Sequence, residues 1–246
     1  MRGLNTAAIS LVSILLITAL VLNIVIRGSF YLESLNFISD YQDSGNSSLT
    51  IFYNLISLLV NTIVVCVFFG LLYICYVRKI TVLVFLSYFL INTYIMMLMK
   101  TSFQEVRPFW YSADIKQLEW GCPSEFGNPS GHSWLVPLIY EPLVTDITGP
   151  GYYQLGYLFP LVAIVLVPIS RMYLGAHSGN QVLMGLTFGL GMCVLYRYVF
   201  QRWLYWLYEK LLSKIYRIRT MLWLIPVNLL FIAAPLIIFG ISSTSR

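Results

Sequence analysis

Charged residues are scarce in this chain. They make up 10% of its 246 residues, whereas hydrophobic residues make up 59%. Soluble domains have about 25% charged residues, and the core of one soluble domain could not hide so much apolar surface. A bilayer needs only about 20 consecutive apolar residues for each crossing. The composition therefore predicts an integral, multi-pass membrane protein.

Histidine and cysteine are also sparse, with two and four residues. No grouping of His, Cys and carboxylate residues has the spacing of metal ligands, so we expect neither a metal nor another cofactor. Only Cys122 lies outside the predicted helices, which leaves no pair for a disulfide between loops. The 18 tyrosines and 6 tryptophans are typical of membrane interfaces, and we expect no nucleic-acid partner. Repeats and long linkers are absent, so residues 1–246 are predicted to form a single domain.

Apolar windows of transmembrane length recur along the chain, and each is expected to be helical because unpaired backbone groups cannot lie in hydrocarbon. A further window at 130–145 contains Pro137, Glu141 and Pro142, and is either a short broken helix or a re-entrant segment. The fold class is therefore all-α, a polytopic bundle of about six to seven membrane helices. The six clear windows are 7–26, 51–76, 80–99, 155–169, 182–200 and 221–240.

Lysine and arginine are unevenly distributed among the loops. Many lie in 197–219, and Arg78 and Lys79 lie in another loop. Because cytoplasmic loops are enriched in such residues, the segments 28–50, 100–128 and 171–180 are predicted to face the non-cytoplasmic side. Residues 201–219 alternate basic and aromatic side chains, which predicts an interfacial amphipathic helix on anionic lipid. An endomembrane or the plasma membrane is expected, with the mitochondrial inner membrane as an alternative.

Three polar clusters interrupt the apolar sequence, and all three are predicted to lie at the outer or lumenal membrane surface. They are "KTSFQEVRPFW", "NPSGHSW" and "SRMYLGAHSGNQV". Lys100, Arg107 and Arg171 supply three cations with few nearby carboxylates, which suits phosphate. The backbone N–H groups of residues 130–132, where Gly131 lacks a side chain, and the hydroxyl of Ser130 are further candidate phosphate ligands at the start of a helix.

The two histidines complete the groups that phosphoryl transfer needs. If His177 attacks phosphorus, a phosphohistidine intermediate divides hydrolysis into two steps, and His132 on the other side of the phosphorus protonates the leaving oxygen. Gln181 follows His177 by four residues, so one helix face is expected to present both, with Gln181 orienting the ring. Glu105 and Asp114 are expected to be solvated loop charges.

The three clusters together resemble the signatures of the type 2 phosphatidic acid phosphatase superfamily. The matching elements are Lys-x6-Arg-Pro from Lys100, Pro-Ser-Gly-His at 129–132, and Ser-Arg-x5-His at 170–177, within a signature region of 100–181. The resemblance implies an α-helical membrane core and metal-free dephosphorylation. It also implies that His177 is the nucleophile and His132 the acid. Relatives in that superfamily include lipid phosphate phosphatases and glucose-6-phosphatases.

One position departs from the lipid phosphatase pattern. Those enzymes usually carry Asp four residues after the nucleophilic histidine, whereas this chain has Gln181, as glucose-6-phosphatases do. The function predicted is a membrane-bound phosphatase that hydrolyses a phosphate monoester or diphosphate, in the first place of a lipid, through a phosphohistidine. It is expected to be a metal-independent, acid-phosphatase-type phosphoric monoester hydrolase, with membrane lipids around it and a phosphorylated lipid or small phosphate ester as substrate. Two alternatives stay open. One is a weak or inactive phosphatase-like subunit of a membrane complex, and the other is a sugar phosphatase.

Overall fold

The structure is a computed structural model that describes residues 2–75, 79–147 and 153–215. Every regular element within these ranges is helical, so the all-α prediction is confirmed. The elements are α1 (Arg2–Asp43), α2 (Ser47–Leu58), α3 (Thr62–Cys75), α4 (Lys79–Phe103), α5 (Pro108–Tyr111), α6 (Gly131–Pro142), the π-helical η1 (Leu143–Ile147), α7 (Tyr153–Tyr173), α8 (Gly179–Leu195), the π-helical η3 (Tyr196–Phe200) and α9 (Gln201–Ile215).

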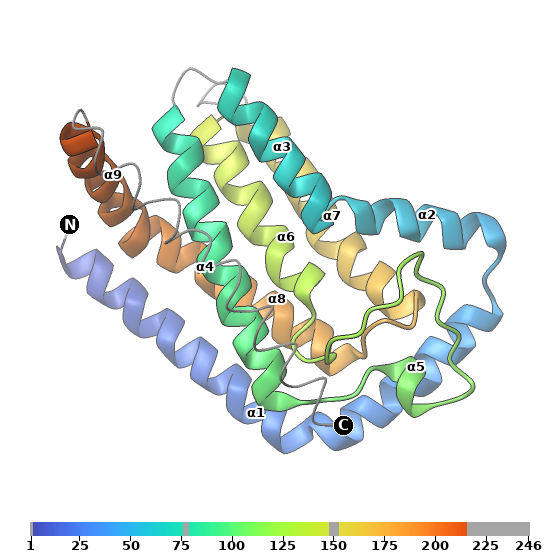
Figure 1. The fold of residues 1–246 in the computed structure, drawn as a ribbon. Helices are drawn as coiled ribbons and strands as arrows, with labels where there is room; N and C mark the ends of the chain where they lie inside the picture. The colour runs from blue at the N-terminus through green and yellow to red at the C-terminus, as the bar shows by residue number, and fades with distance from the viewer. Residues whose placement is uncertain (1, 76–78, 148–152, 216–246) are drawn as a thin grey trace.

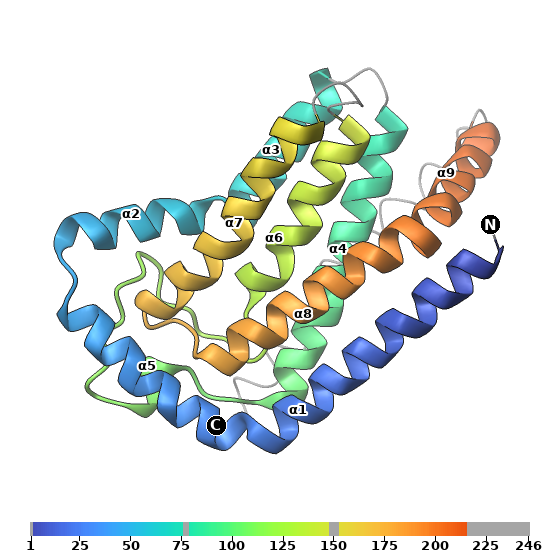
Figure 2. The same cartoon turned by 180° about the vertical axis from the view of Figure 1, so that it is seen from behind.

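The helices form a bundle with a long irregular segment at one end. Figure 1 shows α3, α4, α6 and α7 side by side, with α8 behind them, and Figure 2, seen from behind, shows α8 in front of α6 and next to α1. α1 packs on α8, and α2 leaves the bundle sideways while packing on α7. The chain between α5 and α6 covers the end of the bundle where α4 ends and α6 and α8 begin.

Helices long and apolar enough to cross a membrane lie at apolar windows that the sequence indicated. In the described parts of the chain there are three, Lys79–Tyr111, Gly156–Tyr173 and Gly179–Leu211, or up to five if each of two bent pairs is one span. The arguable window at 130–145 is helical, as α6 and η1. The window at 221–240 lies outside the described residues.

The window at 51–76 is not one straight helix. α2 and α3 meet at a bend of 45°. Asn61 lies at the break, and its side-chain Oδ1 accepts hydrogen bonds from the backbone N–H groups of Ile63 (3.0 Å) and Val64 (3.4 Å). An asparagine that satisfies these otherwise unpaired donors begins a new helix. Hydropathy alone could not detect the bend, because apolar residues continue on both sides of it.

Close packing of α6 on α8 joins two of the polar clusters. A Cβ atom at Gly185 would lie 2.4 Å from the Ser130 carbonyl oxygen, and one at Gly189 would lie 2.3 Å from that of Trp134. Such contacts with backbone cannot relax, so the two glycines allow the helices to approach in the manner of small-residue interfaces in membranes. As a consequence, the start of α6 lies against the start of α8.

The other end of α6 explains how this apolar helix accommodates a carboxylate. Arg197 donates to Glu141 and to Asp146, with N–O distances of 2.9 Å in both cases. Charges within membrane helices are normally paired in this way. The ion-pair cluster lies at the end of the bundle away from the polar loop.

Candidate active site

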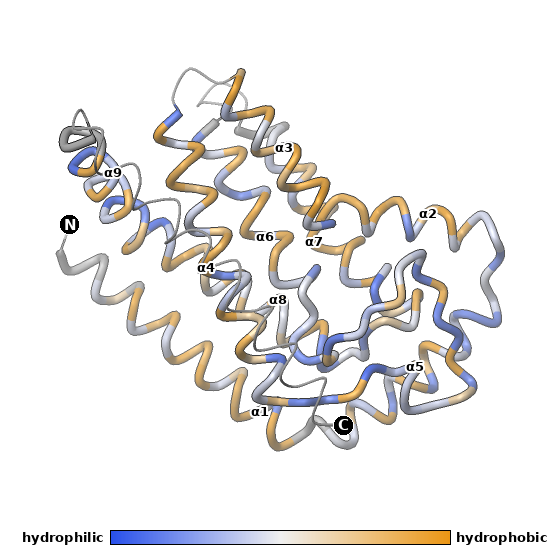
Figure 3. The backbone as a smooth tube through the Cα atoms, in the orientation of Figure 1, coloured by the Kyte–Doolittle hydropathy of each residue, from blue (hydrophilic) through white to orange (hydrophobic). Residues whose placement is uncertain are grey.

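The three polar clusters converge at one end of the bundle. Lys100 lies in the last turn of α4, His132 in the first turn of α6, Arg171 in the last turn of α7, and His177 just before α8. Figure 3 shows that hydrophilic segments gather at this end, around the chain that connects α5 to α6. The predicted convergence of the clusters therefore agrees with the geometry.

Arg107 is the centre of the hydrogen-bond network. Its side chain is 1% exposed. Nη1 donates to the carbonyl oxygen of Ala176 (2.9 Å) and lies 3.2 Å from Nε2 of His177. Nε donates to the Glu125 carbonyl oxygen (2.7 Å) and Nη2 to the Glu125 carboxylate (2.8 Å). All three nitrogens are used, so the planar guanidinium fixes the loop and the histidine together.

The ring of His177 is oriented from its other side by Gln181, at 3.3 Å between Nδ1 and Oε1. The contact was predicted, but the reason was wrong. His177 precedes α8 rather than belonging to it, and Ser178 is the N-cap residue. Gln181 turns back toward the start of the helix, where its Oε1 also accepts the N–H of Ser178 at 3.3 Å. This is the reach of a capping side chain, not a shared helix face.

A tight turn places His177 between α7 and α8. Gly175 has φ of +73°, in the left-handed region that glycine adopts without strain. A Cβ atom there would lie 2.6 Å from the carbonyl oxygen of Lys116. The turn brings the N–H of His177 to the carbonyl oxygen of Arg171 (3.2 Å), so the cation and the histidine of the third cluster are held together.

Lys100 shares its carboxylate partner with Arg107. Lys100 is 3% exposed, and its Nζ lies 3.3 Å from Glu125 Oε1 and donates to the carbonyl oxygen of Phe126 at 3.1 Å. Burial raises the pKa of the Glu125 carboxyl, but the charges of Lys100 and Arg107 together outweigh burial and lower this pKa to about 2. Glu125 is therefore ionised at any physiological pH.

Arg171 is fixed by a second loop carboxylate. Its Nη1 and Nη2 donate to the two oxygens of Glu119, each at 2.7 Å, in a bidentate pair. Nη1 also donates to the hydroxyl of Ser57 at 2.6 Å, and the Ser57 backbone lies close enough to the His132 ring to raise its pKa in part, against the larger lowering by burial and the cations. Nε of Arg171 has no partner within the described residues. Ser57 at the end of α2 thus lies between Arg171 and His132.

These contacts correct the expectation that few carboxylates would lie near the three cations. Glu119 and Glu125 pair with all three, which leaves one net positive charge among the five groups. Neither glutamate could be recognised from the sequence, because loop carboxylates are ordinarily solvated. Ser57 had no recognisable signal either. Across 2–75, 79–147 and 153–215, no three His, Cys, Asp or Glu side chains are grouped to hold a metal ion.

Ser130 and Gly131 take part in the packing and hydrogen bonding at the start of α6. The backbone N–H of Ser130 donates to the carbonyl oxygen of Gln181 (2.9 Å), and its hydroxyl accepts from Ser133 (3.0 Å). The position of Gly131 is tight, since a Cβ atom would lie 3.1 Å from the sulfur of Met96. The Ser130 N–H is therefore already satisfied, contrary to its expected place among the phosphate ligands.

Glu105 is not the solvated loop charge that the sequence indicated. Its Oε1 accepts from Nε2 of Gln181 (2.9 Å) and from Nδ2 of Asn180 (2.7 Å), and its Oε2 accepts from Nδ2 of Asn128 (3.0 Å). Asp114 remains exposed, with its contacts confined to the neighbouring Ser112. Of the two charges, only Glu105 contacts the site.

Both imidazoles are strongly affected by the cations. Burial and then the charges of Arg107, Lys100 and Arg171 hold the pKa of His177 well below its usual range. Burial and then the same cations, Arg171 first, also lower the pKa of His132. With no anion in the site, both rings are neutral at pH 7. A neutral ring is the nucleophilic form, and a bound phosphate dianion would favour the protonated ring again.

Gly127 gives a test of how closely Gln181 must be held. A Cβ atom there would lie 2.5 Å from Oε1 and 2.7 Å from Nε2 of Gln181. Gly127→Ala is therefore expected to push the amide away from His177 and to lower turnover about tenfold, the loss expected when one orienting hydrogen bond is broken. Initial rates of phosphate release check this. The control is Gly121→Ala in the same loop, where no atom lies within 4 Å, and equal rates in the two variants would contradict the expectation.

Comparisons with known proteins agree with the geometry. The sequence model of the PAP2 superfamily matches residues 81–205. Glucose-6-phosphatase catalytic subunit 1 of Felis catus and that of Canis lupus familiaris are each 28% identical over 116 residues, which cover 38% of this chain. The match spans 32% of the length of these relatives.

A solved structure has a similar fold. It is the transmembrane PAP2 type phosphatidylglycerolphosphate phosphatase from Bacillus subtilis, with a TM-score of 0.60 and 24% identity. The alignment covers 76% of this chain and 93% of that one. The family match includes about half of the chain and all three polar clusters, and the resemblance inferred from the signatures is confirmed. The chain belongs to the PAP2 superfamily.

Proposed function

We propose that this protein is a membrane phosphatase that hydrolyses a phosphate monoester or diphosphate of a lipid through a phosphohistidine at His177. The main support is the position of the His177 ring. Its Nδ1 contacts the side-chain oxygen of Gln181, and its Nε2 contacts the guanidinium of Arg107. A ring fixed from behind and aimed at buried cations suits in-line attack on phosphorus, because phosphoryl transfer depends on positioning and charge stabilisation.

The remaining groups take the following roles in this proposal. Lys100, Arg107 and Arg171 bind the phosphoryl oxygens, in competition with the loop carboxylates that contact them in the structure. The Nε2 lone pair of His177 forms a bond to phosphorus while the bond to the leaving oxygen breaks. His132 gives that oxygen its proton and later accepts one from the water that attacks the phosphohistidine.

A lipid substrate is supported by the surroundings of the site. The site lies at one end of a bundle with up to five candidate spans, where a phosphate headgroup can enter while its chains stay in the bilayer. The solved structure of similar fold is a phosphatidylglycerolphosphate phosphatase. The curated relatives are glucose-6-phosphatases, and Gln181 fits the glucose-6-phosphatase pattern described in the sequence analysis, which supports a sugar phosphate as the second candidate.

The site is proposed to face the non-cytoplasmic side. Lys79, at the start of α4, and the basic residues of α9 lie toward the opposite end of the bundle, and such residues favour the cytoplasmic face. α9 is proposed to lie at the headgroup boundary, since Trp203 and Trp206 are exposed and Nζ of Lys210 lies 4.4 Å from the ring centroid of Trp206. Residues 216–219 of the predicted amphipathic segment lie outside the described residues.

Phosphate release from a small set of substrates tests the proposal. The purified full chain in detergent is assayed with dioleoylphosphatidic acid, phosphatidylglycerol phosphate, farnesyl diphosphate and glucose 6-phosphate, with and without EDTA. Release from a lipid substrate that EDTA leaves unchanged is expected, because side-chain cations supply the charge stabilisation. Preference for glucose 6-phosphate supports the sugar phosphatase, and no release from any substrate supports the inactive subunit.

The pKa shifts of the two histidines predict an acidic optimum. Burial and the cations hold both pKa values well below the usual histidine range. Near pH 7 the neutral form therefore dominates for both rings, and the scarce form that the reaction needs is protonated His132, whose fraction grows as pH falls. We therefore expect kcat/KM to rise as pH falls from about 8 to about 5. The profile of kcat should lie at higher pH, because bound phosphate raises the pKa of His132. A kcat/KM that rises with pH over this range would contradict the assignment.

A further inference from the structure

We propose that Glu105 is a positioning residue of the active site, a carboxylate that acts on His177 through the amide of Gln181. The proposal deepens the phosphatase function and rests on it. Gln181 occupies the position where lipid phosphatases of the superfamily usually have Asp. An amide can orient an imidazole but carries no charge to stabilise the imidazolium.

The contacts of Gln181 fix which way its amide points. Nε2 lies 2.9 Å from Oε1 of Glu105 and 2.9 Å from the carbonyl oxygen of Val106. Both partners are acceptors only, so the amide nitrogen must face them. The carbonyl oxygen of Gln181 then faces His177 Nδ1 and the N–H of Ser178. An amide flip would set oxygen against two acceptors and lose these bonds.

The amide orientation in turn fixes the tautomer of His177. Oε1 of Gln181 accepts only from a protonated Nδ1, so Nε2 carries the lone pair. That lone pair faces Nη1 of Arg107, at 3.2 Å, in the cation cluster. Glu105 therefore selects the nucleophilic nitrogen although it does not touch the ring.

Charge is the second contribution of Glu105. When Nε2 bonds to phosphorus, the bond to the leaving oxygen breaks and its electron pair goes to that oxygen, which takes the proton of His132. The His177 ring keeps its Nδ1 proton and becomes positive. A carboxylate that accepts from Gln181 polarises the amide and stabilises this charge. The chain of Glu105, Gln181 and His177 replaces the direct carboxylate partner of the lipid phosphatases.

Glu105 is itself held by the other two polar clusters. Asn128, which precedes the Pro-Ser-Gly-His signature, donates to Oε2 at 3.0 Å, and Asn180 donates to Oε1 at 2.7 Å. Nδ2 of Asn128 also donates to Asn23 of α1. These amides leave the carboxylate little freedom, as a positioning group requires.

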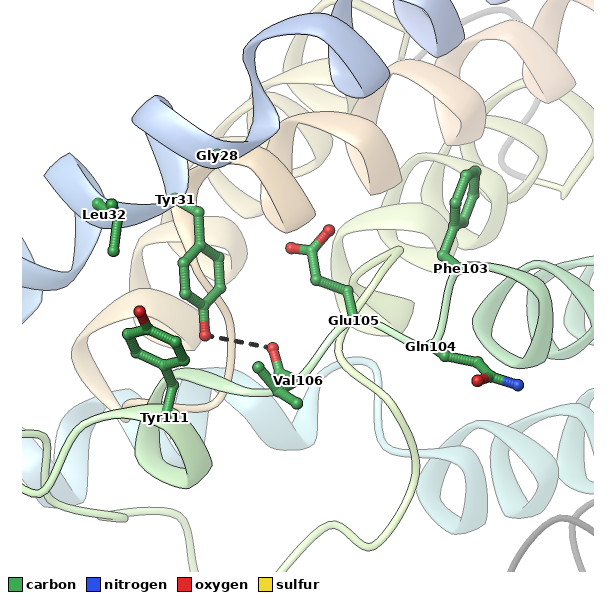
Figure 4. Close-up of a pocket in the computed structure, with 8 residues that line it drawn as sticks. All are labelled: Gly28, Tyr31, Leu32, Phe103, Gln104, Glu105, Val106 and Tyr111. Atoms are coloured by element: carbon green, nitrogen blue, oxygen red, sulfur yellow. Dashed lines mark hydrogen bonds between the residues drawn. The ribbon is translucent and has the colours of Figure 1, made fainter.

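The other side of Glu105 lines a pocket of about 370 Å³. Figure 4 shows Glu105 in this pocket with Tyr31 and Val106, whose carbonyl oxygen accepts from the Tyr31 hydroxyl at 3.4 Å. Val106 thus anchors Gln181 and α1 at once. None of these pocket contacts is a cation, so within the described residues the charge of Glu105 is directed to the amides and not to an ion pair.

Two isosteric substitutions in the full chain test the proposal. Glu105→Gln removes the charge and is expected to lower kcat about tenfold while KM changes less than twofold. Gln181→Glu sets a second carboxylate against Glu105 and is expected to lower kcat about 100-fold. The double variant, which exchanges amide and carboxylate, should be at least about ten times more active than Gln181→Glu alone.

The assay uses dioleoylphosphatidic acid in mixed micelles, with glucose 6-phosphate as a second probe and Asp114→Asn as the control for loss of a loop carboxylate. If Glu105→Gln does not fold, Glu105→Asp replaces it in the test. Aspartate keeps the charge but its shorter side chain moves the carboxylate away from Gln181, so this variant should likewise lower kcat and leave KM unchanged. A kcat within twofold of wild type for the Glu105 variant, or a double variant no better than Gln181→Glu, overturns this inference alone. A wild-type chain that releases phosphate from none of the four substrates named under the proposed function overturns that function, and this inference with it.

Discussion

Replacement of His177 by alanine is expected to abolish phosphate release. The ring is the proposed covalent nucleophile, and removal of such a group costs on the order of 10⁴-fold or more in kcat. His177 is 2% exposed and lies between Arg107 and Gln181, so no solvent-borne group replaces it easily. The measurement is the initial rate of phosphate release from the best substrate of the wild-type chain.

The matched comparison is His132→Ala, which removes an acid rather than a nucleophile. With p-nitrophenyl phosphate, whose leaving group needs no proton, His132→Ala should recover much of its rate, whereas His177→Ala should stay inactive. Equal recovery by the two variants would contradict the assigned roles. Thermal unfolding in detergent separates loss of chemistry from loss of fold.

Replacement of Arg107 by lysine is expected to cost on the order of 10²-fold in kcat/KM, although the charge is kept. Arg107 uses Nε, Nη1 and Nη2 toward Glu125, Ala176 and His177 at the same time. A lysine has one nitrogen and cannot hold these partners together. The loop that carries Glu125 would therefore lose its fixed position at the site, and His177 would lose the cation at Nε2.

The control for this change is Arg202→Lys, a similar substitution at an exposed position of α9. It should leave kcat/KM unchanged. A rate for Arg107→Lys within threefold of wild type would mean that only the charge matters and that the guanidinium geometry does not.

The sequence predicted the convergence of the site because its three clusters are separated by apolar helices that return to the same end of the bundle. It also predicted the contact between His177 and Gln181, although through a helix face instead of an N-cap. The carboxylates were beyond prediction. Glu119 and Glu125 lie in an irregular loop, where no periodicity relates a residue to the cations that it contacts in space.

The fold was predictable in its class and less so in its detail. Hydropathy identified the apolar windows, but it could not detect the bend at Asn61, which depends on a single capping side chain. Nor did it indicate that Gly185 and Gly189 bring α8 against the backbone of α6. Those two contacts fix the distance between the second and third clusters, so they matter more for the site than the number of spans.

The most direct test of the central claim is an experimental structure of the full chain with orthovanadate, which adopts the geometry of the phosphoryl group in transfer. We expect vanadium to be bonded to Nε2 of His177, with its oxygens contacted by Lys100, Arg107 and Arg171 and the ring of His132 on the opposite side of the metal. Vanadate bound elsewhere, or two imidazoles too far apart to bracket one atom, would contradict this claim.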